Sequence, residues 1–249
     1  MFKITLSEAS LLKDSIPIIA EIIDEGVLKV DKTGVGMISP DRTMVSVIDF
    51  KILSSAFEKY EVDKEEHVGL NMGNFAAVLK RAGTNDKITL ELGKDGKLQV
   101  VLEGNGVRKF ELPIIDVTTE KPPIDQLNFG GKVELDSNIV EEGIQDAEVI
   151  GDAVFFEAGP EQFRMYSKGS VSATELKFGK NDKGVLSLTA EKLIKAQYPL
   201  DYLKKMIKIG KLSPQMALEF GDDYPLKMTF KAIDKMQLTF ILAPRVTEE

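Results

Sequence analysis

The sequence of 249 residues contains no cysteine and only one histidine, His67. Without cysteine the chain can have no disulfide framework, no thiolate metal site and no thiol nucleophile. This absence also favours an intracellular location. His67 lies in the acidic segment 63–68 with no candidate nucleophile beside it, so we expect it to be a surface side chain rather than a catalytic base.

The sequence also lacks several segments that other functions require. No apolar run approaches the roughly 20 residues of a membrane-spanning helix, and the opening residues do not have the basic-then-apolar layout of a secretory signal. No glycine-rich phosphate loop precedes an expected helix, and the acidic pairs at 65–66 and 222–223 lack the spacing of a calcium loop. We therefore expect no catalytic residue, no metal, no cofactor and no membrane partner.

The composition, with 43% hydrophobic and 29% charged residues, is typical of a globular protein. The length suits one large β domain or two domains of ordinary size. The net charge of −8 argues against nucleic-acid binding by an evenly charged surface, because phosphate contact needs a basic footprint. The distribution of charge along the chain decides whether this objection holds.

The apolar pattern of the chain recurs when 128 is added to each residue number. Under this repeat shift Lys80 falls on Lys208 and Gly93 falls on Gly221, and the alternating apolar positions of segment 88–92 fall on those of segment 216–220. A slip of one residue would put alternating strands out of phase, and these stay in phase. Chance agreement between two amphipathic stretches is the alternative. The sequence therefore predicts two similar domains.

The sequence predicts the same order of elements at the start of each half. A strand opens it, and a helix follows at about 9–23 in the first half and 137–150 in the second. A pair of strands comes next, before a short helix at about 72–82 and 200–209. Pro17 would kink the first long helix or lie in the first turn of a shorter one.

Strands with period-two alternation close each half, as in 88–92, 98–102 and 110–112. Asp95-Gly96 and Asn105-Gly106 supply the hairpin turns. Antiparallel strands with two helices gathered on one face of the sheet define an α+β fold. Adjacent Pro122 and Pro123 remove backbone donors and favour extended chain, so we expect an N-terminal domain at 1–116, a connecting loop at 117–128 and a C-terminal domain at 129–249.

Charge is sorted between the helices. The short helices are basic, with a net +2 over 72–83 and +3 over 199–212, whereas the long ones are acidic, with −4 over 8–25 and −6 over 136–152. Lys204, Lys208 and Lys211 have the spacing i, i+4, i+7 and would share one helix face. A solvated amphipathic face is the alternative; recurrence under the repeat shift favours function. No base-reading motif is present, so DNA contact would be to phosphate and independent of sequence.

Four stretches give the chain a resemblance to a known family: Ser39–Asp49, the segment from Leu70 to Arg81, Phe110–Asp116 and the tail Leu242–Val246. Taken together in this order, over essentially the whole chain, they resemble the proliferating cell nuclear antigen family of DNA sliding clamps, and its archaeal members in particular. The resemblance implies a processivity factor for DNA replication and repair. It implies a homotrimer of two-domain subunits, a pseudo-sixfold ring with sheets outside and helices inside that encircles duplex DNA.

By the same resemblance, strand 107–112 of one subunit pairs with strand 171–178 of the next, which leaves no free edge at that boundary. The interface residues would be Arg81, Arg108, Lys109, Phe110, Glu141, Glu142, Thr174 and Leu176. The family also implies an apolar pocket that captures a short hydrophobic motif of DNA polymerase, DNA ligase and flap endonuclease, and a clamp loader that opens the ring. The pocket residues would be Met44, Val45, Val47, Ile124, Leu127, Pro225, Ala243 and Pro244. Val45 and Val47 could instead serve the core.

The acidic second long helix departs from the family, in which this helix offers basic residues to the hole. DNA contact is therefore assigned to Lys13, Lys80, Lys204, Lys208 and Lys211. Our hypothesis is that Glu141 or Glu142 pairs across the subunit boundary with Arg81 or Arg108. A subunit of a heterotrimeric or checkpoint-type clamp is the alternative function. The expected location is cytoplasmic and nucleoid-associated, or nuclear if the source is eukaryotic.

Overall fold

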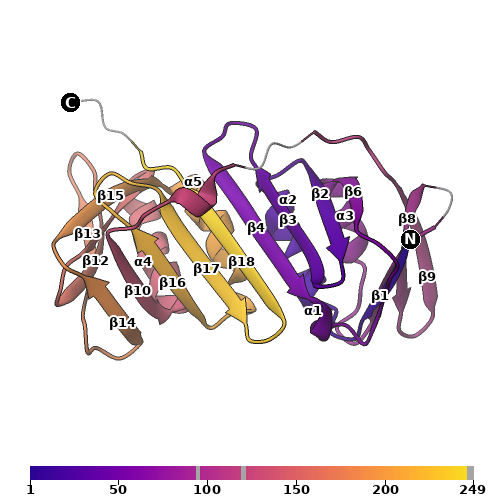
Figure 1. The fold of residues 1–249 in the computed structure, drawn as a ribbon. Coiled ribbons are helices and arrows are strands. Elements are labelled where there is room, and N and C mark those ends of the chain that lie inside the picture. Colours follow the sequence, from indigo (N-terminus) through magenta and orange to yellow (C-terminus); the bar gives the residue numbers. More distant parts are fainter. Residues whose placement is uncertain (94–95, 119–121, 246–249) are drawn as a thin grey trace. The chain divides into compact units, whose positions relative to one another are not determined.

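The computed structural model describes residues 1–93, 96–118 and 122–245. The chain divides into two compact units, one formed by Met1–Pro122 with Lys231–Leu238 and the other by Pro123–Phe230 with Thr239–Glu249. Each unit contains antiparallel strands and short helices (Figure 1).

The first unit begins with strand β1 and holds two sheets. In the order of the chain its elements are β1 (Phe2–Leu6), α1 (Ser10–Lys13), α2 (Ile16–Ala20), β2 (Glu25–Asp31), β3 (Gly34–Pro40), β4 (Ser46–Leu53), the 3-10 turn η1 (Ser54–Ala56), β5 (Lys59–Val62), β6 (Glu66–Asn71), α3 (Met72–Leu79), β7 (Lys87–Leu92), β8 (Lys97–Glu103) and β9 (Val107–Pro113). One sheet has the order β5-β1-β7-β8-β9, and the other strands follow the order β4-β3-β2-β6.

The second unit repeats this arrangement. Its elements are the 3-10 turn η2 (Ile124–Gln126), β10 (Gly131–Asp136), α4 (Ser137–Ile150), β11 (Ala153–Ala158), β12 (Gln162–Lys168), β13 (Ala173–Gly179), β14 (Val185–Ala190), β15 (Ile194–Pro199), α5 (Leu200–Met206), the 3-10 helix η3 (Ile207–Lys211), β16 (Gln215–Phe220), and the larger parts of β17 (Leu226–Ala232) and β18 (Met236–Leu242). The end of β17 and the start of β18 belong to the first unit. Its strands follow the orders β14-β10-β16-β17 and β13-β12-β11-β15.

The repeat shift holds in the structure. Strands β3, β6 and β7 coincide at both ends with β12, β15 and β16 when 128 is added to their residue numbers. The two four-stranded orders, β4-β3-β2-β6 and β13-β12-β11-β15, are the same order in repeat-equivalent strands. The prediction of two similar α+β halves is therefore confirmed.

Alternation along the strands builds a core in each unit. In β1, Phe2, Ile4 and Leu6 are buried, and in β7 Ile88 and Leu90 are buried. The second unit adds edge-to-face aromatic contacts, because the Phe156 ring meets Phe163 and Phe220 with centroids 6.0 Å and 6.2 Å apart. In Figure 1, α2 and α3 lie behind β2 and β3, and α4 lies behind β10 and β16.

The first predicted long helix is wrong in detail. Instead of one helix over 9–23 there are two short ones, α1 and α2, and Pro17 lies in the first turn of α2. Proline is tolerated there because the first helical N–H groups have no intrahelical acceptor. The predicted helix at 137–150 is confirmed by α4 at both ends. No helix of the described residues has the length and apolar character needed to cross a lipid bilayer.

Two other predictions need correction, and a third can be compared with the structure only in part. Five strands, β2 to β6, occupy the segment where a pair was expected. The α-helix predicted at 200–209 ends at Met206, and the chain continues to Lys211 as a 3-10 helix. The turn at Asn105-Gly106 lies between β8 and β9 as predicted, but Asp95 of the other turn lies outside the described residues.

Candidate functional site

Helix α3 ends directly before the two basic residues Lys80 and Arg81. Asn71 caps its N-terminus, since the Asn71 side-chain oxygen accepts a hydrogen bond from the Asn74 N–H at 2.9 Å. The helix buries one face, including Phe75 and Leu79. Lys80 is the C-cap and is exposed, as is Arg81 after it. Cations are favourable at this end of a helix because its last carbonyls are partly negative.

Helix α5 and the following η3 carry the lysines of the basic segment 199–212 in the second unit. Leu203 and Met206 are buried on one side, and Lys204, Lys208 and Lys211 are exposed. Because η3 has three residues per turn, Lys208 and Lys211 project in the same direction. The predicted α-helical spacing through Lys211 is therefore wrong, although all three lysines remain solvent-facing.

The acidic helix α4 contacts this basic segment within the second unit. Its residues Glu141, Glu142, Asp146 and Glu148 are all exposed. Glu148 forms an ion pair and hydrogen bond with Lys204. In the first unit, Lys13 ends α1 and is half-buried. Lys204, which is assigned to DNA contact, is therefore already paired with a carboxylate of its own chain.

The turn between β3 and β4 presents Met44 to solvent. Asp41 is buried, and its carboxylate accepts hydrogen bonds from the Ser46 N–H at 2.7 Å and the Thr43 N–H at 3.3 Å. Met44 has φ +59 and 68% of its surface is exposed. A left-handed conformation is unfavourable for a residue with a Cβ, so the Asp41 hydrogen bonds hold an apolar side chain in a strained, exposed position. Val45 and Val47 are half-buried rather than fully buried.

The second unit contributes the other residues predicted for an apolar pocket. Ile124 begins the 3-10 turn η2 and Leu127 follows it, and both are half-buried. Pro225, Ala243 and Pro244 are half-buried as well. The tail is held beside β15, because the Arg245 N–H donates to the Gln197 carbonyl at 2.7 Å and Arg245 pairs with Asp152 at 2.6 Å. Residues 119–121 of the predicted connecting loop, and Val246, lie outside the described residues.

Strands β9 and β13 are the ends of their sheets in the described chain. Phe110 on β9 is half-buried and Lys109 is exposed, while Thr174 and Leu176 on β13 are half-buried. Each strand is hydrogen-bonded on one side, β9 to β8 and β13 to β12. Arg108 near the start of β9 is bound within its own chain by the Asp86 carboxylate and the Arg81 carbonyl.

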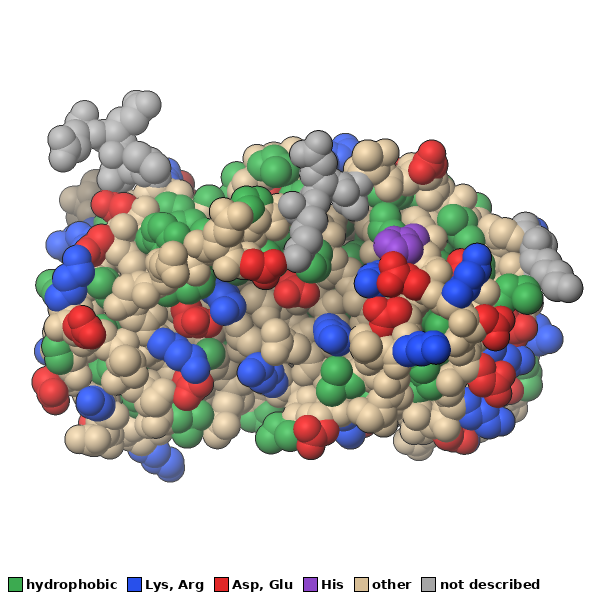
Figure 2. Space-filling view, in the orientation of Figure 1, with side chains coloured by type: hydrophobic (Ala, Val, Ile, Leu, Met, Phe, Trp, Pro, Cys, Tyr) green, Lys and Arg blue, Asp and Glu red, His purple; other side chains and the backbone are tan. Residues whose placement is uncertain are grey.

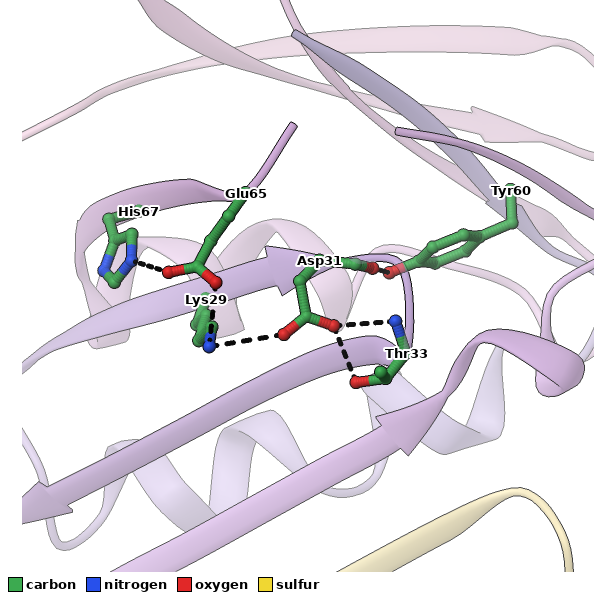
Figure 3. A network of polar contacts seen from close by, with 6 residues as sticks. All are labelled: Lys29, Asp31, Thr33, Tyr60, Glu65 and His67. Carbon is green, nitrogen blue, oxygen red and sulfur yellow. Dashed lines mark hydrogen bonds and ion pairs between the residues drawn. The ribbon is translucent and has the colours of Figure 1, made fainter. Parts of the chain in front are cut away.

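The only histidine lies in a polar network on the first unit (Figure 3). His67 Nε2 is 2.8 Å from Glu65 Oε1, and Lys29 Nζ bridges Glu65 at 2.9 Å and Asp31 at 3.3 Å. Hydrogen bonds from Thr33, together with Lys29, lower the pKa of Asp31 to about 2, and burial raises the pKa of Tyr60 to about 12. His67 is exposed and contacts the Glu65 carboxylate, which is the arrangement expected of a surface histidine.

The face seen in Figure 2 does not carry a patch of one sign, since acidic and basic side chains alternate over it. In the second unit, charge is sorted between the basic α5 and η3 and the acidic α4. In the first unit the predicted sorting is wrong in detail, because Lys80 and Arg81 follow α3, which itself holds no basic residue, and α1 and α2 hold no acidic residue. Among the described residues no group of three or more histidine or acidic side chains is arranged to hold a metal ion.

Two family models together match most of this chain. The N-terminal domain of proliferating cell nuclear antigen matches residues 1–120, and its C-terminal domain matches residues 123–245. The chain belongs to the proliferating cell nuclear antigen family of sliding clamps. It is similar to DNA polymerase sliding clamp 1 of Thermococcus kodakarensis, with 36% identity over 99% of both chains, and to the DNA polymerase sliding clamp of Pyrococcus furiosus, with 32% identity over 99% of both.

Solved structures of the family agree with the fold. A crystal structure of proliferating cell nuclear antigen from Thermococcus kodakaraensis matches with a TM-score of 0.93 and 27% identity, over 98% of this chain and 100% of that one. A complex of PCNA2 and PCNA3 from Sulfolobus tokodaii matches with a TM-score of 0.90 and 26% identity, over 98% and 99% of the two chains. The resemblance to archaeal members and the two-domain clamp fold are therefore confirmed.

Sequence reasoning missed two contacts at the candidate site. The buried Asp86 is not among the predicted residues, although Gly83 and Gly104 on neighbouring loops are a faint signal of close backbone packing. The pairing of Glu148 with Lys204 is also not predicted, because net charge per helix does not say which side chains meet.

Proposed function

We propose that this chain forms a homotrimeric ring around duplex DNA and acts as a processivity factor that tethers replication and repair enzymes. The observation that carries the proposal is the pair of edge strands β9 and β13. Under the repeat shift, β9 corresponds to β18 and β13 corresponds to β4. Within the first unit, the residue before β18 is joined to the end of β4, since the Lys235 carbonyl accepts a hydrogen bond from the Leu53 N–H at 2.8 Å. The same pairing between copies joins β9 of one chain to β13 of the next.

Head-to-tail pairing of two different edges is heterologous, and it gives a closed ring when the rotation between copies closes. It also removes two exposed edges that would otherwise invite aggregation. Three chains with two repeats each give six similar units around the axis. Lys109, Phe110, Thr174 and Leu176 then lie in the interface, with half-buried apolar groups covered by the neighbour.

Ion pairs between copies supplement the strand pairing. We assign Arg81 and Arg108 on one side and Glu141 and Glu142 on the other, all of them exposed. Arg108 is already engaged by Asp86, so Arg81 is the better donor to a neighbouring carboxylate. An Arg108→Glu change is expected to give monomers, and wild-type trimers are expected to loosen at high salt. An intact trimer of the Arg108→Glu variant would count against this interface.

DNA contact falls on Lys13, Lys80, Lys204, Lys208 and Lys211. The charge distribution supports this assignment, because basic side chains gather on α5 and η3 and directly after α3 while the chain as a whole carries −8. Such contacts neutralise phosphates without reading bases, so they are weak, salt-dependent and compatible with sliding. The hold on DNA is then topological, and a clamp loader opens the ring.

Partner enzymes bind through a short hydrophobic motif. The first unit offers Met44, Val45 and Val47, and the second offers Ile124, Leu127, Pro225, Ala243 and Pro244, all at least partly exposed. Capture of a DNA polymerase, DNA ligase or flap endonuclease raises its effective concentration at the DNA. The exposed Met44, held in a left-handed conformation, supports a binding role more than a packing role.

Several further assignments belong to the same proposal. The domain limits are 1–116, 117–128 and 129–249, supported by the equivalence of β1–β9 with β10–β18. The chain has no catalytic activity of its own and works without cofactor or metal, in the cytoplasm at the nucleoid.

The test is the mass of the purified chain in solution. Light scattering is expected to give three times the 27.5 kDa of one chain. A subunit of a heterotrimeric clamp is the alternative, favoured by the similarity to the PCNA2–PCNA3 complex. That alternative predicts the mass of a single chain for this protein alone, and a larger species only with a different family member.

A further inference from the structure

Asp86 is a buried carboxylate in the loop between α3 and β7. It lies where this loop meets the turn between β8 and β9, beside a depression of about 780 Å³ lined by residues 83–87 and 103–105. Asp86 makes its polar contacts at the edge of this depression.

The Asp86 carboxylate joins two segments that belong to different elements. Its Oδ2 accepts a hydrogen bond from the Gly83 N–H at 2.9 Å and also receives the Arg108 guanidinium. Arg108 Nη1 donates in turn to the Arg81 carbonyl at 2.8 Å. Arg108 is the second residue of β9, and Arg81 follows the C-cap of α3. A charge-assisted contact thus ties the segment after α3 to the start of the edge strand.

Two glycines leave room for the carboxylate. A Cβ on Gly104 would lie 1.9 Å from Asp86 Oδ1, and a Cβ on Gly83 would lie 2.9 Å from the same atom. The first distance is far inside contact, so a side chain at 104 would displace Asp86 or the turn that carries Gly104. The backbone of both loops is therefore shaped around this one group.

The second repeat does not contain this arrangement. Under the repeat shift, Asp86 corresponds to Pro214 and Arg108 corresponds to Met236, which is buried. The ion pair therefore occurs in the repeat whose strand β9 is left as an edge, and its place in the other repeat is taken by residues that form no ion pair. Because the second repeat folds without this ion pair, the pair is not a general requirement of the fold.

We propose that Asp86 is a positioning residue for self-association. Acting through Arg108, it holds the first residues of β9 and the neighbouring Arg81 in the place where a second copy of the chain pairs with them. This inference rests on the proposed ring. It adds that a residue with no contact to the partner sets how well the edge strand binds.

The experiment measures dissociation of the full-length trimer by sedimentation over a range of protein concentration. Asp86→Ala is expected to shift the midpoint for dissociation at least tenfold toward higher concentration, while circular dichroism of the chain stays unchanged. Glu58→Gln is the matched control, because Glu58 lies outside β9 and pairs with Lys87 at 2.7 Å in an exposed position. It is expected to shift the midpoint by less than twofold.

Two further variants test whether Asp86 acts through Arg108. In an Arg108→Ala background, Asp86→Ala is expected to add little, because its partner is already gone. Gly104→Ala is expected to weaken association in the same direction as Asp86→Ala, without any change of charge. Simple addition of the Asp86 and Arg108 effects would overturn the positioning role.

The outcomes separate this inference from the proposed function. A wild-type trimer together with an Asp86→Ala variant of unchanged midpoint overturns the role of Asp86 and leaves the ring intact. A wild-type chain that remains at 27.5 kDa alone overturns the homotrimer and the Asp86 inference together.

Discussion

Lys204 of α5 and Glu148 of α4 form an ion pair within the second unit. The pair joins the basic segment proposed for DNA contact to the acidic helix beside it. Both side chains are about half exposed, at 43% and 49%, so the pair is worth little as a source of stability. If Lys204 contacts DNA as proposed, its charge is shared between Glu148 and a phosphate.

Replacing Glu148 with glutamine is expected to strengthen DNA binding. The change releases Lys204, and the salt dependence of binding should steepen by up to about 0.9 in log–log slope for each new phosphate contact. Titration of labelled duplex DNA at several salt concentrations measures both quantities. Asp146→Asn is the control, since it removes one negative charge from the same helix at another exposed position. If both variants strengthen DNA binding equally, the cause is the lower negative charge of α4 and not the loss of the Glu148–Lys204 ion pair.

Replacing Lys80 and Lys208 with alanine is expected to weaken DNA binding and loading. Removing a lysine that touches a phosphate makes the salt slope shallower by about 0.9, because fewer counterions are released. The same titration measures the slope for each variant. Lys64→Ala is a suitable control, because Lys64 is an exposed lysine outside the proposed DNA-contact set. An unchanged slope would remove Lys80 and Lys208 from the DNA contact.

Replacing Met44 with glycine is expected to separate binding from stability. Glycine accepts the φ of +59 without strain, so the free energy of unfolding should stay the same or rise by up to about 1 kcal/mol. Affinity for a short partner peptide with aromatic anchors should fall about tenfold, because the peptide no longer meets an exposed apolar side chain at this position. Calorimetry of binding and thermal unfolding measure the two effects.

Ile233→Ala is the control for Met44, since Ile233 is another exposed apolar residue of the first unit, at 84%. It lies between β17 and β18 and has no part in the proposed pocket. A peptide affinity that falls equally in both variants would point to general surface hydrophobicity. Unchanged affinity in Met44→Gly would exclude Met44 from the partner site.

Replacing Asp31 with asparagine is expected to make unfolding less dependent on pH. The hydrogen bonds from Thr33 lower the pKa of Asp31 in the folded chain to about 2, against about 3.9 when unfolded. A lowered folded pKa contributes stability that is present above about pH 4 and is lost as the pH falls toward 2. The variant should therefore be less stable at pH 7, by about 1 kcal/mol, and show a smaller further loss below pH 4.

Thermal unfolding midpoints between pH 2 and pH 7 provide the measurement for Asp31. Asp63→Asn serves as the control, because Asp63 is an exposed aspartate of the same unit. An acid profile of Asp31→Asn identical to that of the wild type would show that the Thr33 and Lys29 contacts do not stabilise the fold.

The repeat is predictable because alternation of apolar residues is a local property of the chain. Ile88 and Leu90 have their counterparts in Met216 and Leu218, and all four are buried. Helix α4 is predictable at both of its ends, since an amphipathic pattern of 14 residues leaves little freedom of phase. For the first helix the sequence allows two alternatives at Pro17, because a proline fits either a kink or a first turn.

Contacts between side chains distant in the sequence are not predictable in this way. Glu148 and Lys204 are 56 residues apart, and Asp86 and Arg108 are 22 apart on different elements. The sequence shows the charge on each segment, but the partner of a charge depends on how the segments pack. The strained, exposed position of Met44 is hidden for the same reason, since it depends on hydrogen bonds to the buried Asp41.

By itself, the sequence determined the repeated α+β architecture, the separation of the lysine-rich segment at 199–212 from the acidic helix at 137–150, and the family. These follow from periodicity and residue type, which are written along the chain. Only the tertiary structure decided the strand order in each sheet, that Glu148 pairs with Lys204, and that Asp86 joins the segment after α3 to β9. Strand order and long-range ion pairs require the folded chain, because they depend on distances in space rather than positions in the sequence.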